Sequence, residues 1–319
     1  MPLIHSSFAP AISLRSPHTQ TIVPALLRNP HVTPPQTQTL ETSDNDILLY
    51  RLHQHSNPRL AVISHGLEGS FDSSYVRGMT RALVTSGWDV LTWNMRGCGD
   101  MPNRLVTWHH SGKSDDLASI VRFACSLPYA SVSLVGFSVG GNITLKYLGE
   151  ELGSIPDKVR SALVISVPMD LEGSALQLAK RRNAIYMQYL LRPLRRRIRE
   201  KATRFPGLFD TRGLSRITTF HEFDRRFTAP FHGFSSVGEY WHSSSSLRYL
   251  HNLRIPTLAL TAIDDPFLSS SCIPVEIAKT HEHLHLEVSK HGGHVGFMRS
   301  LNLASVWTEE RAVHFLDHH

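Results

Sequence analysis

Short apolar runs alternate with stretches of helical periodicity along much of the chain. The runs predict strands, and the segments after them, with apolar residues three or four apart, predict helices. Strand candidates lie at 37–41, 47–53, 60–64, 88–94, 131–137, 162–167, 255–261 and 284–288. The first two flank a polar turn and predict a hairpin. Strands that alternate with helices predict an α/β fold with a mostly parallel sheet between helical layers.

Two stretches interrupt this alternation. Residues 170–250 offer no strand of comparable quality but keep apolar positions at helical spacing, which predicts a helical cap or lid between two core strands. Residues 1–35 are rich in Pro and Ser, and we expect an extended arm with one short helix near 22–27. The core is therefore predicted at 1–169, with the arm included, and at 251–319.

The strand at 131–137 runs into Gly-Phe-Ser-Val-Gly at 136–140, and a helical pattern follows at once. Glycines two positions before and after Ser138 remove side chains that would collide with backbone in a tight strand-to-helix turn. Such an elbow exposes the serine hydroxyl above the end of a sheet. Gly-x-Ser-x-Gly alone is a weak pattern, but its position here indicates a nucleophile.

A serine hydroxyl becomes a good nucleophile only when a base takes its proton and a third group orients the base. Two candidate segments follow the last two predicted strands, at the end where open α/β sheets bind ligands. The first contains Asp264 and Asp265, and the second contains His294. The order Ser138, Asp265, His294 predicts a catalytic triad, with Asp170 after an earlier strand as the alternative acid.

An oxyanion needs two backbone donors near the nucleophile. Val139 follows the nucleophile, and Leu67 lies in the His-Gly-Leu loop after the strand at 60–64. We therefore expect the N–H groups of Leu67 and Val139 to form the oxyanion hole.

Seven short motifs occur along the chain, at 16–21, 65–70, 94–98, 110–112, 136–142, 265–267 and 292–297. With them the chain resembles the YheT-like group of α/β-hydrolases, which is similar to the ABHD lipases and to yeast medium-chain fatty-acid ethyl ester synthase/esterases. His109 and Trp241 stand where tyrosines are usual. The resemblance implies the α/β-hydrolase fold, Asp265 rather than Asp264 as the acid, and metal-free chemistry on medium-chain or lipid-like carboxylic esters.

The formal charge of +6 comes from one segment, because residues 180–204 hold ten Lys and Arg against one acid. Apolar residues between them predict an amphipathic cap helix. We expect Ile185, Tyr189 and Leu190 to face inward and line an acyl pocket. The Arg-rich face would stay in water or make peripheral contact with an anionic membrane surface. Without a recognised nucleic-acid motif, no nucleic-acid partner is expected.

Cysteine usage points to a reducing compartment, since Cys98, Cys125 and Cys272 are far apart and odd in number. No apolar run approaches the roughly 20 residues of a membrane span, and the first residues do not read as a signal peptide. We therefore expect a cytoplasmic protein. The alternating histidines at 281–285 favour an exposed strand face over a metal site, and no metal or cofactor is expected.

These patterns predict a serine carboxylesterase that works through an acyl-enzyme on a small-molecule ester. Two alternatives stay open at this stage. One is an acyltransferase that passes the acyl group to an alcohol on the same triad. The other is a non-catalytic membrane- or RNA-associated binding module with the hydrolase fold. Labelling of Ser138 by a fluorophosphonate would separate the enzymes from the binding module.

Overall fold

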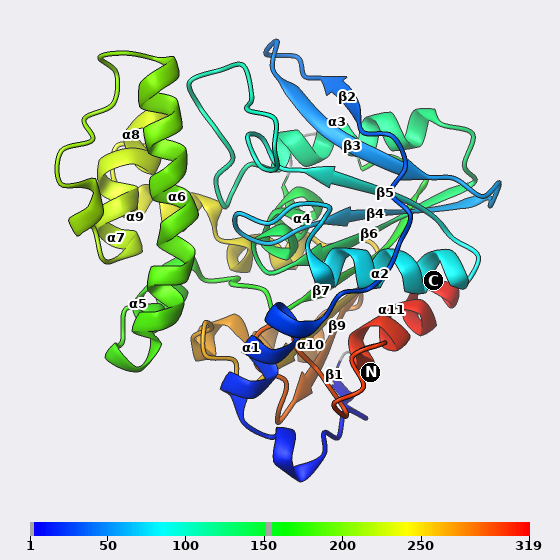
Figure 1. The fold of residues 1–319 in the computed structure, drawn as a ribbon. Helices are drawn as coiled ribbons and strands as arrows, with labels where there is room; N and C mark the ends of the chain where they lie inside the picture. Colours follow the sequence, from blue (N-terminus) through cyan, green and yellow to red (C-terminus); the bar gives the residue numbers. More distant parts are fainter. Residues whose placement is uncertain (1–2, 151–154) are drawn as a thin grey trace.

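A single nine-stranded sheet forms the centre of the computed structural model, which describes residues 3–150 and 155–319 (Figure 1). Its strands are β1 (Leu3–His5), β2 (Gln38–Glu41), β3 (Ile47–His53), β4 (Arg59–Ser64), β5 (Asp89–Asn94), β6 (Ser131–Phe137), β7 (Val159–Ile165), β8 (Thr257–Ala262) and β9 (Leu284–Ser289). The order across the sheet is β1-β9-β8-β7-β6-β4-β5-β3-β2. Only the pairs of β3 with β2 and with β5 are antiparallel among the described strands. The predicted mostly parallel sheet and hairpin are confirmed.

Helices cover both faces of this sheet, and further helices form a layer beside it. They are α1 (Pro17–Leu27), α2 (Ser74–Thr85), α3 (Ser114–Ser126), α4 (Val139–Gly149), α5 (Leu171–Leu178), α6 (Ala184–Arg204), α7 (Phe220–Phe223), α8 (Ala229–Phe231), α9 (Val237–Ser244), α10 (Val275–Thr280) and α11 (Trp307–Asp317). Alternate residues of β4 join opposite cores: Leu60 and Val62 pack in the apolar cluster of α3 and α4, Ala61 and Ile63 in that of α2 and α11. This alternation is the pleat of a strand buried on both sides.

Residues 170–250, which we call the cap segment, run from α5 to α9 between β7 and β8. They form a separate helical layer beside the sheet, on the left in Figure 1. The layer has an apolar cluster of its own, built on Tyr186, Leu191, Phe223 and Phe227. No strand is found in this stretch, all of which is described. The segment has the helical character that its periodicity predicts.

The N-terminal arm is more ordered than we expected. The helix near 22–27 begins five residues earlier, at Pro17, because Ser16 caps it by accepting a hydrogen bond from the Thr19 N–H. In addition, β1 extends the sheet by pairing in parallel with β9. The expected helix is therefore present but longer, and the arm also supplies a short edge strand that we did not expect. The missed signal was the Ser-Pro pair at a helix start.

No helix within the described residues is both long and apolar enough to cross a bilayer. The three cysteines are free thiols, and Cys98 and Cys272 are buried. Burial raises the pKa of the Cys98 thiol to about 12, which keeps it protonated and unreactive at neutral pH.

Candidate active site

Ser138 occupies a strained turn between β6 and α4. Its φ of +50° and ψ of −119° are rarely adopted by residues with a side chain. The turn is held on both sides, because the Ser138 N–H donates to the Ile165 carbonyl at 2.9 Å and the Asn142 N–H donates to the Ser138 carbonyl at 3.0 Å. A Cβ added at Gly136 or Gly140 would lie 2.6 or 2.3 Å from neighbouring backbone. Only glycine fits there, as the motif predicts.

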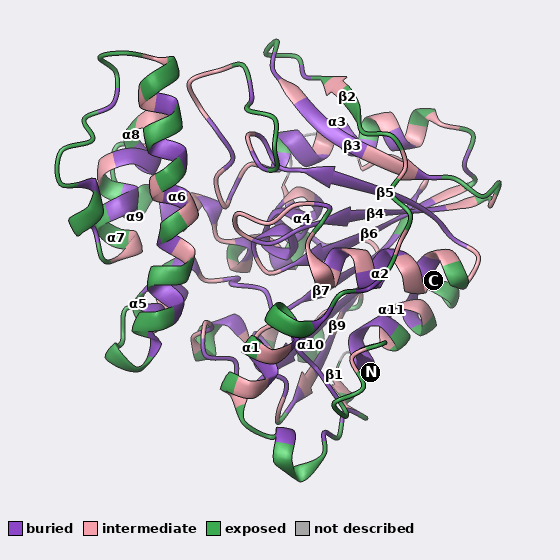
Figure 2. Cartoon of the chain, viewed as in Figure 1, coloured by how far each residue is buried: buried purple, intermediate pink, exposed green. Residues whose placement is uncertain are grey.

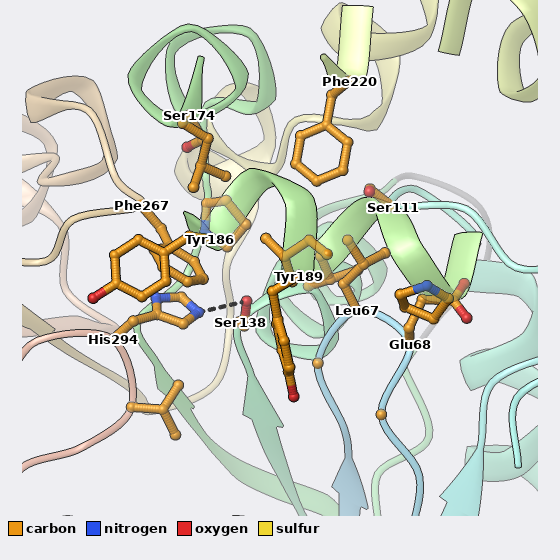
Figure 3. A pocket seen from close by; sticks show the side chains of 18 of the residues that line it. Leu67, Glu68, Ser111, Ser138, Ser174, Tyr186, Tyr189, Phe220, Phe267 and His294 are labelled. Carbon is orange, nitrogen blue, oxygen red and sulfur yellow. Dashed lines mark hydrogen bonds between the residues drawn. The ribbon is translucent and has the colours of Figure 1, made fainter. Parts of the chain in front are cut away.

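The side chains of Ser138, His294 and Asp265 form one hydrogen-bonded chain. Figure 3 shows the bond between His294 and Ser138. His294 Nε2 lies 3.0 Å from Ser138 Oγ, and Nδ1 lies 2.8 Å from Asp265 Oδ2. The Asp265 side chain is fully buried, and its other oxygen accepts the Phe267 N–H at 2.8 Å. A buried carboxylate can only accept, so His294 carries its proton on Nδ1 and leaves Nε2 free to take the serine proton.

Neither of the other candidate acids reaches His294. Asp264 lies beside His291, with 3.3 Å between Oδ2 and Nδ1. Asp170 caps the start of α5 by accepting a backbone N–H. Of the three carboxylates weighed from the sequence, the structure therefore brings only Asp265 to the histidine.

Two contacts to His294 were not anticipated. The Phe267 ring stacks on the imidazole, with centroids 4.1 Å apart and an interplanar angle of 19°. The His294 N–H donates to Thr21 Oγ1 of α1 at 2.9 Å. Helix α1 also meets the cap segment, because His18 Nδ1 lies 2.8 Å from the Tyr186 hydroxyl. The N-terminal helix thus supports the histidine loop. Its cap in the sequence could have revealed where the helix starts, but not this contact.

The loop after β4 is anchored through a buried neutral histidine. His65 Nε2 accepts the Met95 N–H at 3.0 Å, so its Nδ1 carries the proton and donates to the Gly66 carbonyl at 2.7 Å. Burial lowers the pKa of His65 to about 4, consistent with a neutral ring. The Gly66 N–H donates to the Tyr75 hydroxyl at 2.9 Å. These bonds hold both the N–H and the carbonyl of Gly66 in place.

The two expected oxyanion donors face the same cavity as Ser138. Val139 is the first residue of α4, where a backbone N–H has no partner within the helix. Within the described residues the Leu67 N–H has no recorded acceptor either. Both N–H groups are therefore available to bind an oxygen anion.

A cavity of about 720 Å³ lies over Ser138, between the ends of the core strands, α1 and the cap segment. Apolar side chains dominate its wall, among them Leu178, Phe220 and Trp241. Ile185 and Tyr189 also line it, but they are 80% and 69% exposed. They stand at its open edge, whereas we expected them to face inward. Half-buried Leu190 is the one of the three that lies deeper.

Most of the basic run at 180–204 forms the solvated face that we expected, since seven of its ten cations are exposed, but two of the ten do not. Arg197 and Lys201 are buried, and Figure 2 shows buried and exposed positions alternating along α6. Lys201 Nζ donates to Asn103 Oδ1 at 2.7 Å and to the Thr107 carbonyl at 3.2 Å. Arg196 and Arg199 point to solvent. Part of the charge therefore joins the cap segment to core loops, which supply the acceptors.

Comparison with known proteins identifies the family. The model of the alpha/beta hydrolase fold family matches residues 62–300. The chain belongs to the α/β-hydrolases. This hydrolase is 31% identical over 315 residues to the protein of Escherichia coli (strain K12) that is named "Putative esterase YheT". The match covers 96% of this chain and 92% of YheT. The resemblance to the YheT-like group is therefore confirmed.

Two further comparisons are more distant. Phospholipase ABHD3 of Bos taurus is 27% identical over 265 residues, which cover 82% of this hydrolase and 64% of the phospholipase. Esterase Pf2001 of Pyrococcus furiosus superposes with a TM-score of 0.59 at 16% identity, over 97% and 96% of the two chains. The latter shows a shared fold. Among the described residues of this hydrolase, no group of three His, Cys, Asp or Glu side chains is arranged to hold a metal ion.

Proposed function

We propose that this hydrolase cleaves carboxylic esters with medium-chain or lipid-like acyl groups, with Ser138 as nucleophile. The observation that carries the proposal is the unbroken chain from Ser138 Oγ through His294 to buried Asp265, at 3.0 and 2.8 Å. It lies at the floor of an apolar cavity. A non-catalytic binding module would have no need of this alignment or of the strained elbow.

The reaction follows from the geometry. Ser138 Oγ attacks the ester carbonyl while His294 Nε2 takes its proton, and Asp265 stabilises the imidazolium that forms. The Leu67 and Val139 N–H groups bind the oxyanion of the tetrahedral intermediate. His294 then returns the proton to the departing alcohol, which leaves an acyl-Ser138 ester. Water activated by His294 releases the acid and restores the serine; an alcohol in place of water would give acyl transfer.

The cavity supports an acyl chain as its occupant. It is large and mostly apolar, and each methylene buried there contributes roughly 0.8 kcal/mol. Exposed Leu26 of α1 and exposed Ile185 and Tyr189 of α6 surround its open edge, with Arg192 beside them. Such a rim suits the surface of an anionic lipid aggregate, from which a lipid-like ester would enter. The match to a phospholipase agrees with this choice.

Labelling tests the nucleophile without knowledge of the substrate. A fluorophosphonate should label the wild type at Ser138, and Ser138→Ala and His294→Ala should lower turnover of a short p-nitrophenyl ester by several orders of magnitude, up to about a millionfold. Asp265→Asn should also be crippled, while Asp170→Asn is the matched control because asparagine also caps a helix. Wild-type turnover in Ser138→Ala would exclude this function.

The acyl pocket is tested with Leu190→Trp, which fills space in the cavity wall. For wild type, kcat/KM should climb with acyl length from about two carbons until the cavity is full. The variant should reach its maximum at a shorter chain. Identical profiles of kcat/KM against acyl length would mean that the cavity does not hold the acyl chain, and the proposed triad would be unaffected by that result.

A further inference from the structure

Three separate segments meet at the guanidinium group of Arg197 in α6. Its Nε and Nη2 donate to the two carboxylate oxygens of Glu68 at 3.1 and 2.7 Å. Its Nη1 donates to the Gly97 carbonyl at 2.8 Å. The side chains of Arg197 and Glu68 are only 7% and 8% exposed. The cap segment is thereby tied to the loops that follow β4 and β5.

Glu68 directly follows the oxyanion donor Leu67 in the chain. Its φ of +54° is unusual for a residue with a side chain. The Gly69 N–H donates to the Gly66 carbonyl at 3.0 Å and closes a turn around Leu67 and Glu68, while Arg197 holds the Glu68 side chain from outside the loop. The other side of Leu67 is held by Gly66, which is bonded to Tyr75 and His65. The Leu67 peptide therefore lies between two anchors, and the second anchor comes from the cap segment.

The second anchor has the chemistry of a precise clamp. A bidentate pair between a guanidinium and a carboxylate fixes orientation as well as distance, which an ammonium cannot do. The loop after β5 is shaped for the contact, since Gly97 has a φ of +74° and an added Cβ would lie 2.6 Å from Arg197 Nη1. A buried ion pair adds little stability beyond that of apolar residues packed in its place. The role of this pair is therefore better inferred from its geometry than from its contribution to stability.

We propose that Arg197 is a positioning residue for the oxyanion hole. Through Glu68 it sets the Leu67 N–H, so the donor is in place only when the cap segment is seated on the core. The cap segment then does more than admit acyl chains, because it completes the machinery that stabilises the transition state. This inference rests on the proposed function. A lost oxyanion donor lowers kcat by about 100- to 1000-fold, and a displaced donor should lose part of that factor.

The test measures kcat and KM for p-nitrophenyl acetate and p-nitrophenyl octanoate in Arg197→Gln, Arg197→Lys and Glu68→Gln. We expect kcat to fall about 10- to 100-fold in Arg197→Gln, equally for both esters and with little change in KM. Arg197→Lys, which keeps the charge but loses the fork, should recover part of the rate. Arg196→Gln is the matched control, one residue away and exposed, and should stay within about twofold of wild type.

A trifluoromethyl ketone adds a readout that a purely structural role would not move. It forms an oxyanion adduct with the serine, so its inhibition constant should rise in parallel with the loss of kcat. If Arg197→Gln does not fold, Arg197→Lys and Glu68→Gln carry the test, because both keep size and polarity.

Two results would overturn the inference. One is wild-type kcat in the folded Arg197 and Glu68 variants. The other is a change in KM without a fall in kcat, or a fall in activity toward the octanoate ester alone. Either would mean that the cap segment selects substrates and does not position the oxyanion donor. In either case the proposed function would still hold, provided that Ser138→Ala abolishes the turnover seen in wild type. Turnover that survives Ser138→Ala would instead exclude the proposed function itself.

Discussion

The two halves of helix α6 differ in which side chains they expose and which they bury. In the first half, residues 184–192, the apolar side chains of Ile185 and Tyr189 are exposed at the edge of the cavity. In the second half, residues 193–204, the cations Arg197 and Lys201 are buried against core loops. Hydrophobicity alone assigns these four residues wrongly, although it places most of the helix correctly.

The difference comes from what each half meets. Residues 103–107 and Glu68 offer oxygen acceptors to the second half, and a cation is stable out of water when acceptors surround it. The first half meets the mouth of a cavity, where no core segment covers its outer face. The second half therefore attaches the cap segment, while the first half is left free to contact substrate or a lipid surface.

The largest expected effect separates a buried cation from its exposed neighbour. Arg197→Ala leaves buried Glu68 without its guanidinium partner, with only His109 Nε2 at 3.5 Å beside it among the described residues, which should lower the free energy of unfolding by about 3–5 kcal/mol. Arg196→Ala removes an exposed ion pair and should change it by about 0.5 kcal/mol or less. Urea unfolding of the two variants measures the contrast. Equal losses would mean that burial against the core loops does not distinguish Arg197 from an exposed arginine of the same half.

The sequence reveals most of the core because the patterns there are local. The strand at 131–137 and the elbow around Ser138 follow from residues adjacent in the chain. The role of Arg197 does not, because its acceptors are about 100 residues or more away in sequence. For the same reason Thr21 could not be connected to His294. Long-range polar contacts of this kind leave no periodic signal.

A charge placed on the first half should affect function and leave stability nearly intact. Ile185→Asp and Tyr189→Asp change exposed positions, so unfolding should shift by about 0.5 kcal/mol or less. Turnover of a long-chain ester presented on anionic vesicles should fall about 10-fold, because the apolar rim is lost and like charges repel. A soluble acetate ester should be unaffected, and Ile185→Ala is the control for side-chain size. Equal activity of the variants and wild type on vesicles would mean that the rim plays no part in substrate entry.

The pH dependence of stability tests how the second half holds its cation. Burial, assisted by Arg204 and Arg197, lowers the pKa of Lys201 to about 7 from 10.5. Between these values the unfolded chain binds a proton that the folded chain lacks, so the free energy of unfolding rises with pH. Relative to Lys201→Met, wild type should gain about 1 kcal/mol from pH 7 to pH 9.5, after allowance for solvent screening. No relative gain, or a relative loss, would mean that the oxygen acceptors outweigh burial and keep the ammonium charged.

The smallest effect concerns a hydrogen bond between the first half of α6 and α1. The Tyr186 hydroxyl lies 2.8 Å from His18 Nδ1, while the Tyr186 ring packs on Phe267 with centroids 5.0 Å apart. Tyr186→Phe keeps the packing and removes the bond, which should cost about 0.5–1.5 kcal/mol of unfolding free energy. A double-mutant cycle with His18→Ala isolates the bond itself. Strictly additive losses would show that the contact contributes nothing, and the first half would then be attached by apolar packing alone. A coupling of about 1 kcal/mol would instead make this bond a weak counterpart of the clamp at Arg197, as expected for the half that borders the substrate entrance.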